Sequence, residues 1–196
     1  MVTEIELKAH VADYEAIKLV LSEKAKYLGV FEKEDSYWFP KEASISSKSY
    51  RLRKEKREID GMEKSASFIS YKKKEVRDEI EINEEREFEV KPGELAGEFF
   101  HELGFESGIS KRKRGWAYTW EGITAELVEV EGLGWFVELE ILIEKQQEEN
   151  FEAAKKRLLD FLDDLGIKKE ALESRFYTEM LLSRTPSGVT VTLPTP

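Results

Sequence analysis

The sequence of 196 residues contains no cysteine and only two asparagines and two glutamines. The absence of cysteine excludes a disulfide-stapled fold, a zinc–thiolate centre and a cysteine nucleophile. No apolar run approaches the roughly 18 residues that a membrane-spanning helix requires. The first eight residues alternate in charge and contain no apolar stretch. We therefore expect no secretory signal peptide, a cytoplasmic location and no association with a membrane.

The charge balance excludes a further class of protein. Charged residues make up 37% of the chain, and 41 acidic against 31 basic residues give a formal net charge of −10. Binding of a nucleic-acid polymer requires a basic face, so we expect no such partner. The preference for Glu and Lys over thermolabile Asn and Gln predicts a thermophilic source.

Hydropathy alternates with a period of two in eight segments, which is typical of strands with one apolar and one polar face. These predicted strands are 2–9, 31–40, 49–55, 67–75, 79–90, 109–120, 123–130 and 135–143. Apolar residues at helical spacing predict four helices, over 13–26, 95–103, 148–165 and 169–183. The order predicts one α+β domain over residues 1–183, followed by an uncharged, proline-containing tail over 184–196.

The polar faces of the predicted strands are sorted by charge, because pairs of like charge recur at a spacing of two, which places both members on one face. Acidic pairs are Glu4/Glu6 and Glu138/Glu140, and basic pairs are Arg51/Arg53, Lys72/Lys74 and Arg112/Arg114. In one interpretation these faces are solvated and exchange cross-strand salt bridges, each worth about 0.2–1 kcal/mol. In the other, the strands close into a barrel with a charged interior. Such an interior suits divalent cations on the carboxylates and phosphate groups on the basic side chains.

Several motifs resemble the CYTH superfamily, whose members are also called triphosphate tunnel metalloenzymes. Glu4-Ile5-Glu6-Leu7-Lys8 matches its ExExK signature, and residues 130–140, VEGLGWFVELE, resemble its V-E-G-L-G-x-F-x-E-x-E segment. Further resemblances, in the family's order, are the segments at 35–39, 50–53, 70–72, 86–89, 111–116 and 177–181. The resemblance covers residues 1–183 and is strongest to the class IV adenylyl cyclase branch.

The resemblance implies a closed eight-stranded antiparallel β-barrel with a charged lumen and helices packed outside. It also implies Mg²⁺ or Mn²⁺ as cofactor and a small-molecule triphosphate as substrate. Metal ligands would be Glu4, Glu6, Glu138 and Glu140, and phosphate ligands would be Lys8, Arg51, Arg53, Lys72, Arg86, Arg112, Arg114 and Arg175. Lys8 is also the one candidate catalytic base, with phosphate binding as its alternative role.

Two positions leave alternatives open. In the run Lys111-Arg112-Lys113-Arg114, a register shifted by one residue places the two lysines in the lumen instead of the two arginines. The family often has an aspartate two residues before V-E-G-L-G, where this sequence has Val128. Glu126 lies on the same strand face and is a candidate substitute as a metal ligand.

Three functions compete at this stage. The first is a cyclase that converts ATP to cyclic AMP and pyrophosphate. The second is a triphosphatase acting on thiamine triphosphate, a nucleoside triphosphate or inorganic tripolyphosphate. The third is a polyphosphate- or nucleotide-binding module without turnover, which the substitution at Val128 motivates. No residue pattern specifies an oligomer, although the apolar tail and the C-terminal helices are candidates for a homodimer contact.

Overall fold

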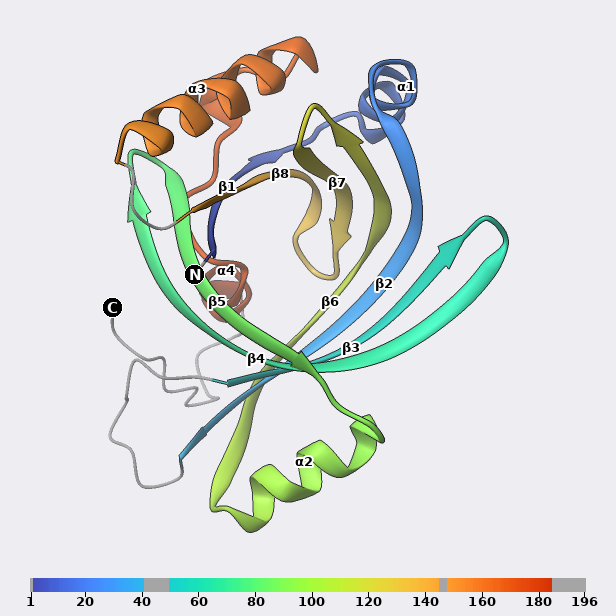
Figure 1. The fold of residues 1–196 in the computed structure, drawn as a ribbon, viewed down its shortest axis with the longest axis vertical. Helices are drawn as coiled ribbons and strands as arrows, with labels where there is room; N and C mark the ends of the chain where they lie inside the picture. Colours follow the sequence, from blue (N-terminus) through green and yellow to red (C-terminus); the bar gives the residue numbers. More distant parts are fainter. Residues whose placement is uncertain (1, 41–49, 145–147, 185–196) are drawn as a thin grey trace.

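The computed structural model describes residues 2–40, 50–144 and 148–184 as a closed antiparallel β-barrel with helices outside it (Figure 1). The strands are β1 (Val2–His10), β2 (Lys26–Pro40), β3 (Tyr50–Ile59), β4 (Met62–Arg77), β5 (Ile80–Glu89), β6 (Phe105–Trp120), β7 (Ile123–Val130) and β8 (Gly134–Glu144). Around the barrel they follow the order β1-β5-β4-β3-β2-β6-β7-β8. The predicted fold class and its eight strands are confirmed.

The N-terminal strand closes the barrel. In β1, Glu4 lies opposite Asn83 of β5, while Glu6 lies opposite Glu140 of β8. Because alternate residues of each strand face the same side, one set of carboxylates points into the interior: Glu4 and Glu6 of β1, Glu81, Glu85 and Glu87 of β5, and Glu138 and Glu140 of β8. The first strand therefore joins the acidic parts of the sequence that lie far apart along the chain.

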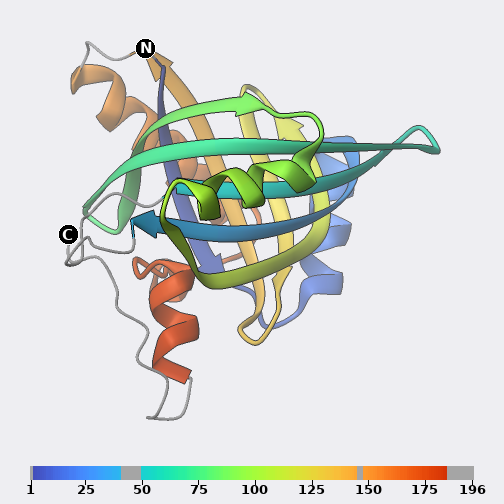
Figure 2. The same ribbon diagram turned by 90° about the horizontal axis from the view of Figure 1, so that it is seen from below.

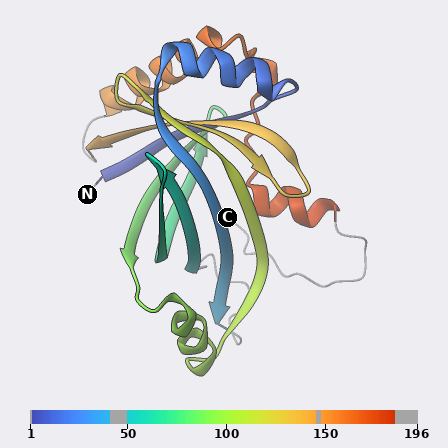
Figure 3. The same cartoon turned by 90° about the vertical axis from the view of Figure 1, so that its right-hand side faces the viewer.

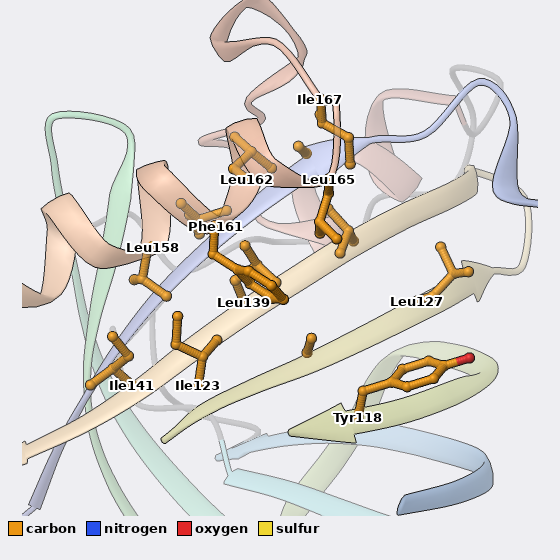
Figure 4. Packing of buried hydrophobic residues seen from close by; sticks show 14 of the residues in the cluster. Tyr118, Ile123, Leu127, Leu139, Ile141, Leu158, Phe161, Leu162, Leu165 and Ile167 are labelled. Atoms are coloured by element: carbon orange, nitrogen blue, oxygen red, sulfur yellow. The ribbon is translucent and has the colours of Figure 1, made fainter. Parts of the chain in front are cut away.

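The outward apolar faces of β1, β7 and β8 are covered by α1 (Tyr14–Lys24) and α3 (Glu148–Asp164). Figure 4 shows the underside of α3, where Leu158 and Phe161 pack over Leu139 and Ile141 of β8. Phe161 also stacks on Trp120 with 4.5 Å between ring centroids. These side chains exclude water, so the main hydrophobic core of the described residues lies outside the barrel.

A third helix covers the opposite side of the barrel. Figure 3 shows α2 (Gly93–Glu102) far from α1 and α3, which lie together. Phe100 of α2 packs with Leu52 of β3, and Trp38 of β2 stacks on Phe100 at 5.4 Å. Both faces of the barrel wall are thus used: apolar residues contact helices and charged residues face inward.

The prediction of one helix over 169–183 is wrong. The segment forms a short 3₁₀ turn, η1 (Lys169–Ala171), and then α4 (Tyr177–Arg184). Between them the chain pairs with β1, where Leu172 bridges Ala9 and the Glu173 N–H donates to the Lys8 carbonyl. This pairing interrupts the helix and directs α4 to one opening of the barrel (Figures 1 and 3). Most of the predicted tail, 185–196, lies outside the described residues.

Several strands extend beyond their predicted ranges, among them β2, β3, β4 and β6. β2 begins at Lys26 rather than residue 31, and its start is hidden by a register shift at Gly29 that breaks the alternation. Gly29 has φ 131°, and a Cβ there would lie 2.2 Å from the Glu58 carbonyl oxygen. The hairpin of β3 and β4 extends beyond the barrel wall (Figure 2) and turns at Asp60 and Gly61, both with positive φ. None of the helices in the described ranges is long and apolar enough to cross a membrane.

The wall at β6 and β7 provides a test of this packing. A Cβ at Gly115 would lie 2.0 Å from the Leu127 carbonyl oxygen, whereas one at Gly97 in α2 meets nothing closer than 3.5 Å. We expect Gly115→Ala to lower the free energy of unfolding by about 1–3 kcal/mol, because the two strands must move apart. Gly97→Ala, the control, should raise it by up to about 1 kcal/mol through helix propensity. Chemical denaturation measures both, and a neutral Gly115→Ala would contradict the close strand contact.

Candidate active site in the barrel interior

The barrel encloses a cavity of about 1070 Å³. Its charged lining comes from alternate residues of the strands, including both members of the pairs Glu4/Glu6, Arg51/Arg53 and Glu138/Glu140. The interpretation with solvated outer faces is therefore wrong for these pairs. Buried charges are tolerated only when they are paired and hydrogen-bonded, so the contacts inside the cavity define what the site is able to do.

One acidic group lies at β1 and β5. The Glu4 carboxylate accepts from the Lys72 ammonium at 3.0 Å and from the Asn83 amide at 3.0 Å. Burial opposes ionisation of Glu4, but Lys72 and these hydrogen bonds outweigh it and lower its pKa to about 2. Glu4 is therefore a carboxylate at neutral pH, held by a residue predicted to bind phosphate.

A second group lies at β7 and β8. Glu138 accepts from the Lys113 ammonium at 2.6 and 2.7 Å, and Glu126 accepts from Lys33 at 2.5 and 2.8 Å. The two glutamates lie directly opposite each other across the strands. Burial alone would raise both carboxyl pKa values, but the lysines lower them. Each carboxylate again has a basic partner.

Two glutamates are not stabilised in this way. Burial and the neighbouring carboxylates Glu81 and Glu138 raise the pKa of Glu6 well above its usual value. Burial and Glu4 raise the pKa of Glu140 to about 7. Negative charge is thus in excess where β1 meets β8, and a cation bound there would relieve the repulsion.

The basic side of the interior is built on β3. Arg53 donates to both carboxylate oxygens of Asp35 at 2.7 and 3.0 Å, and Arg51 donates to Glu85 at 2.6 Å and Glu87 at 2.9 Å. Burial disfavours the charged form of Arg53, but Asp35 outweighs it and raises the pKa of Arg53 well above its usual value. Guanidinium groups held in this way present fixed donors that match phosphate oxygens.

Lys8 lies deep in the interior, with only 2% of its surface exposed, and its ammonium pairs with Glu81. The ring of Tyr177, the first residue of α4, lies 5.5 Å from this ammonium and 5.3 Å from that of Lys111. The Tyr177 hydroxyl is buried and forms no hydrogen bond with the described residues. Burial and Glu138 raise the pKa of Tyr177 well above its usual value, so it is a neutral phenol.

The placement of Arg112 and Arg114 in the lumen is wrong. Both point outward with side-chain exposures of 65% and 70%, and they pair with Glu34 and Glu129 on the outer surface. Lys111 and Lys113 are buried in the cavity instead. The alternative register of this strand is therefore the correct one, because pairing with β7 places Lys113 opposite Val130 and turns both lysines inward.

Two further basic residues predicted to bind phosphate lie elsewhere. Arg86 is exposed on β5, between the inward-facing Glu85 and Glu87, and so lies on the outer face. Arg175 is 60% exposed, and its guanidinium donates to Glu173 at 2.6 and 3.0 Å without lining the cavity. The motif that contains Arg86 thus has this residue on the strand face opposite the interior. The pairing of Glu173 with β1 keeps Arg175 outside the cavity.

Val128 is fully buried and packs with Phe31, Phe136 and Tyr177 in an apolar cluster. These residues lie on the inward-facing positions of their strands, so the cluster fills the part of the interior beneath α4. A carboxylate at position 128 would take the place of an apolar side chain in this cluster. The acidic residue on the inward face of β7 is instead Glu126, two residues before Val128.

The sequence-based list of site residues omitted several interior side chains. They are Lys33, Asp35, Tyr37, Glu55, Arg57, Lys74, Glu81, Asn83, Glu85 and Glu87. Most continue an alternation already recognised: Glu55 and Arg57 extend Arg51/Arg53 along β3, and Glu81 to Glu87 form an inward acidic row on β5. Following each alternation to the end of its strand would have identified them.

The interior carboxylates fit a hard divalent cation in their chemistry, because Mg²⁺ and Mn²⁺ prefer oxygen ligands. In the described part of the chain, no three His, Asp or Glu side chains already form a group arranged to hold a metal ion. Instead, lysine ammonium groups contact Glu4, Glu126 and Glu138 and neutralise these carboxylates as a cation would. Glu4, Glu126 and Glu138 therefore become fully available to a cation when these lysines move to another anion, whereas Glu6 and Glu140 are not held by a lysine in the described part of the chain.

The fold and interior define a class of protein: an antiparallel barrel that encloses a polyionic cavity of both signs. A family model for the CYTH domain matches residues 3–177, and the chain belongs to this family. The family is one of metal-dependent triphosphate tunnel enzymes. The predicted family membership is confirmed.

Individual relatives agree with this assignment. A protein of Methanocaldococcus jannaschii named as a candidate adenylate cyclase is 30% identical over 113 residues, which is 58% of this chain and 63% of that protein. The match thus spans less than two thirds of the relative. The PH1012 protein of Pyrococcus horikoshii is 34% identical, with TM-score 0.71 over 90% of this chain and 98% of its own. The PH1819 protein of the same organism is 27% identical, with TM-score 0.80 over 93% and 99%.

The raised pKa of Glu140 predicts a pH-dependent stability. The unfolded carboxyl ionises near pH 4.5, but the folded one ionises near pH 7. The folded state therefore binds the extra proton between these values, and ionised Glu140 destabilises it progressively as the pH rises through this window. We expect Glu140→Gln to stabilise the metal-free protein at pH 8, by on the order of 3 kcal/mol, and to have little effect below pH 4.5.

Thermal or denaturant unfolding in EDTA at several pH values measures this effect. Glu131→Gln, in the exposed turn between β7 and β8, controls for the loss of one negative charge. Equal stabilisation by Glu140→Gln at pH 5 and pH 8 would contradict the assigned cause.

Proposed function

We propose that this protein is a divalent-metal-dependent enzyme that acts on a triphosphate-bearing substrate inside the barrel. Mg²⁺ or Mn²⁺ would be held by Glu4, Glu6, Glu138, Glu140 and Glu126. The phosphate oxygens would be bound by Lys8, Lys33, Arg51, Arg53, Lys72, Lys111 and Lys113. Because the Lys8 ammonium is already held by Glu81, we assign Lys8 to phosphate binding rather than to proton transfer.

One observation carries this proposal: the carboxylates suited to the cation are paired with the lysines suited to the phosphates. Lys72 holds Glu4, Lys113 holds Glu138 and Lys33 holds Glu126. A metal–triphosphate complex brings one partner for each side, since the cation takes the carboxylates and the phosphates take the ammonium groups. The exchange keeps every buried charge paired, whereas either component alone would leave some unpaired.

For the reaction itself we propose cyclisation of ATP to cyclic AMP and pyrophosphate. The ribose 3′ hydroxyl loses its proton to solvent water and its oxygen attacks the α-phosphorus, the bond from that phosphorus to the oxygen that bridges to the β-phosphorus breaks, and pyrophosphate leaves. A bound cation supplies neutralisation of the charge that develops on the phosphates. Arg51, Arg53 and the interior lysines would hold the triphosphate in line for this attack. The named relative from M. jannaschii supports this choice.

The alternative reaction is hydrolysis of the same type of substrate, in which water rather than a ribose oxygen attacks a phosphorus. The interior residues serve both reactions equally, because they contact the triphosphate rather than the group attached to it. Binding without turnover is the remaining alternative, although Glu126 offers a carboxylate on β7 despite Val128.

An assay panel separates these functions. The purified protein is incubated with ATP, thiamine triphosphate and inorganic tripolyphosphate, each with Mg²⁺ or Mn²⁺, and cyclic AMP, pyrophosphate and orthophosphate are resolved. We expect cyclic AMP and pyrophosphate from ATP. Release of orthophosphate without cyclic AMP would establish a triphosphatase, and tight binding without any product would contradict the proposal that the protein is an enzyme. Glu138→Gln and Arg53→Ala should each abolish turnover in a folded protein.

A matched pair of variants tests the inward register of β6. Lys113 faces the cavity and Arg114, the next residue, faces solvent. We expect Lys113→Met to weaken tripolyphosphate binding in the presence of Mg²⁺ at least tenfold, because a charge-assisted contact is lost. Arg114→Met should leave binding within about twofold. Titration calorimetry measures both, and a larger effect of Arg114→Met would refute the assignment.

A further inference from the structure

Asn83 is a polar residue at the centre of the acidic group at β1 and β5, and this asparagine has no role in the proposed function. It lies on β5, directly opposite Glu4 of β1, and is 0% exposed. Its amide nitrogen donates to Glu4 Oε1 at 3.0 Å and lies 3.5 Å from Glu6 Oε2. The side chain thus joins the two glutamates of the first strand.

The other half of this amide has no partner. Asn83 Oδ1 is buried and accepts no hydrogen bond from the described residues. The basic residue opposite it on β4, Lys74, pairs with Glu81 at 3.5 Å instead. A buried carbonyl oxygen without a donor costs about 1–3 kcal/mol. The oxygen is therefore available to a positively charged ligand that reaches this part of the cavity.

We infer that Asn83 is a further ligand residue of the divalent-cation site, supplying its amide oxygen beside the carboxylates of Glu4 and Glu6. The inference rests on the proposed function, which places a cation in this interior. Asparagine side-chain oxygens are common ligands of hard divalent cations. The neutral amide adds an oxygen without adding a third negative charge to two adjacent carboxylates.

Rotation of the amide about its Cβ–Cγ bond explains how one side chain serves both states. Without a cation, the N–H₂ group faces the carboxylates and donates to them. After a half-turn, the oxygen faces them, which is unfavourable beside two negative charges alone. The same orientation becomes favourable once a cation lies between the oxygens. The amide therefore exchanges its donor for its acceptor when the cation binds.

Two substitutions separate an oxygen ligand from a hydrogen-bond donor. Asn83→Leu removes both functions at similar volume, whereas Asn83→Asp retains an oxygen and has no N–H. We expect Asn83→Leu to weaken Mg²⁺ binding at least tenfold and Asn83→Asp to retain it, as measured by titration calorimetry. If both variants bind Mg²⁺ at least tenfold more weakly, the amide acts only as a donor and the inference is overturned. Asn150→Asp, on α3, makes the same charge change and should bind Mg²⁺ like the unmodified protein.

A second measurement needs no substitution at Asn83. The chain contains only two asparagines, so selective labelling of asparagine with ¹³C at Cγ yields two side-chain signals. Asn150→Asp removes one and assigns the other. We expect Mg²⁺ to shift the Asn83 signal along the same saturation curve as the calorimetric titration, while the Asn150 signal stays in place.

The outcomes distinguish this inference from the proposed function. Absence of Mg²⁺ binding to the unmodified protein, with and without tripolyphosphate, would overturn both. Mg²⁺ binding with an unmoved Asn83 signal, or with unchanged affinity in Asn83→Leu, would overturn only the role of Asn83.

Discussion

The pairing of carboxylates with ammonium and guanidinium groups inside the barrel is the interaction on which the rest of the structure depends. Closing eight strands with charged inner faces would be prohibitively costly if those charges were left alone. Asp35 with Arg53, and Glu138 with Lys113, show how cross-strand register supplies the partners. Because the charged side chains face inward, the outer faces of the strands are apolar, and α1, α2 and α3 pack against these outer faces.

Period-two alternation made most of the fold predictable, because it reports directly which face of a strand is apolar. The acidic pairs of β1 and β8 were placed correctly for this reason, since Ile5 and Leu139 mark the outer face clearly. Alternation gave no such information in Lys111–Arg114, where every residue is basic. There the register is decided by pairing with β2 and β7, which local sequence does not contain.

The prediction of one helix in the C-terminal segment failed for a different physical reason. Residues 169–183 have helical spacing, but Leu172 bridges Ala9 of β1 and the Glu173 N–H donates to the Lys8 carbonyl, and a continuous helix would forgo this pairing. This long-range pairing overrides local propensity and carries Tyr177 into the interior. The apolar cluster around Tyr177 then accounts for Val128, which looks like a defect of the metal site when only the family motif is compared. In the barrel it belongs to the packing beneath α4, and Glu126 carries the charge.

The net charge of −10 conceals an interior in which both signs are concentrated and matched. A matched interior is stable without a ligand and suits a ligand that is itself an ion pair, because the proposed metal–triphosphate complex would replace each partner in kind. The match is incomplete at Glu6 and Glu140, where burial and like charges oppose ionisation. Asn83 lies beside the same strand with an unused oxygen. The least stable part of the interior is thus the part where a cation gains the most, as expected if stability there has been given up for binding.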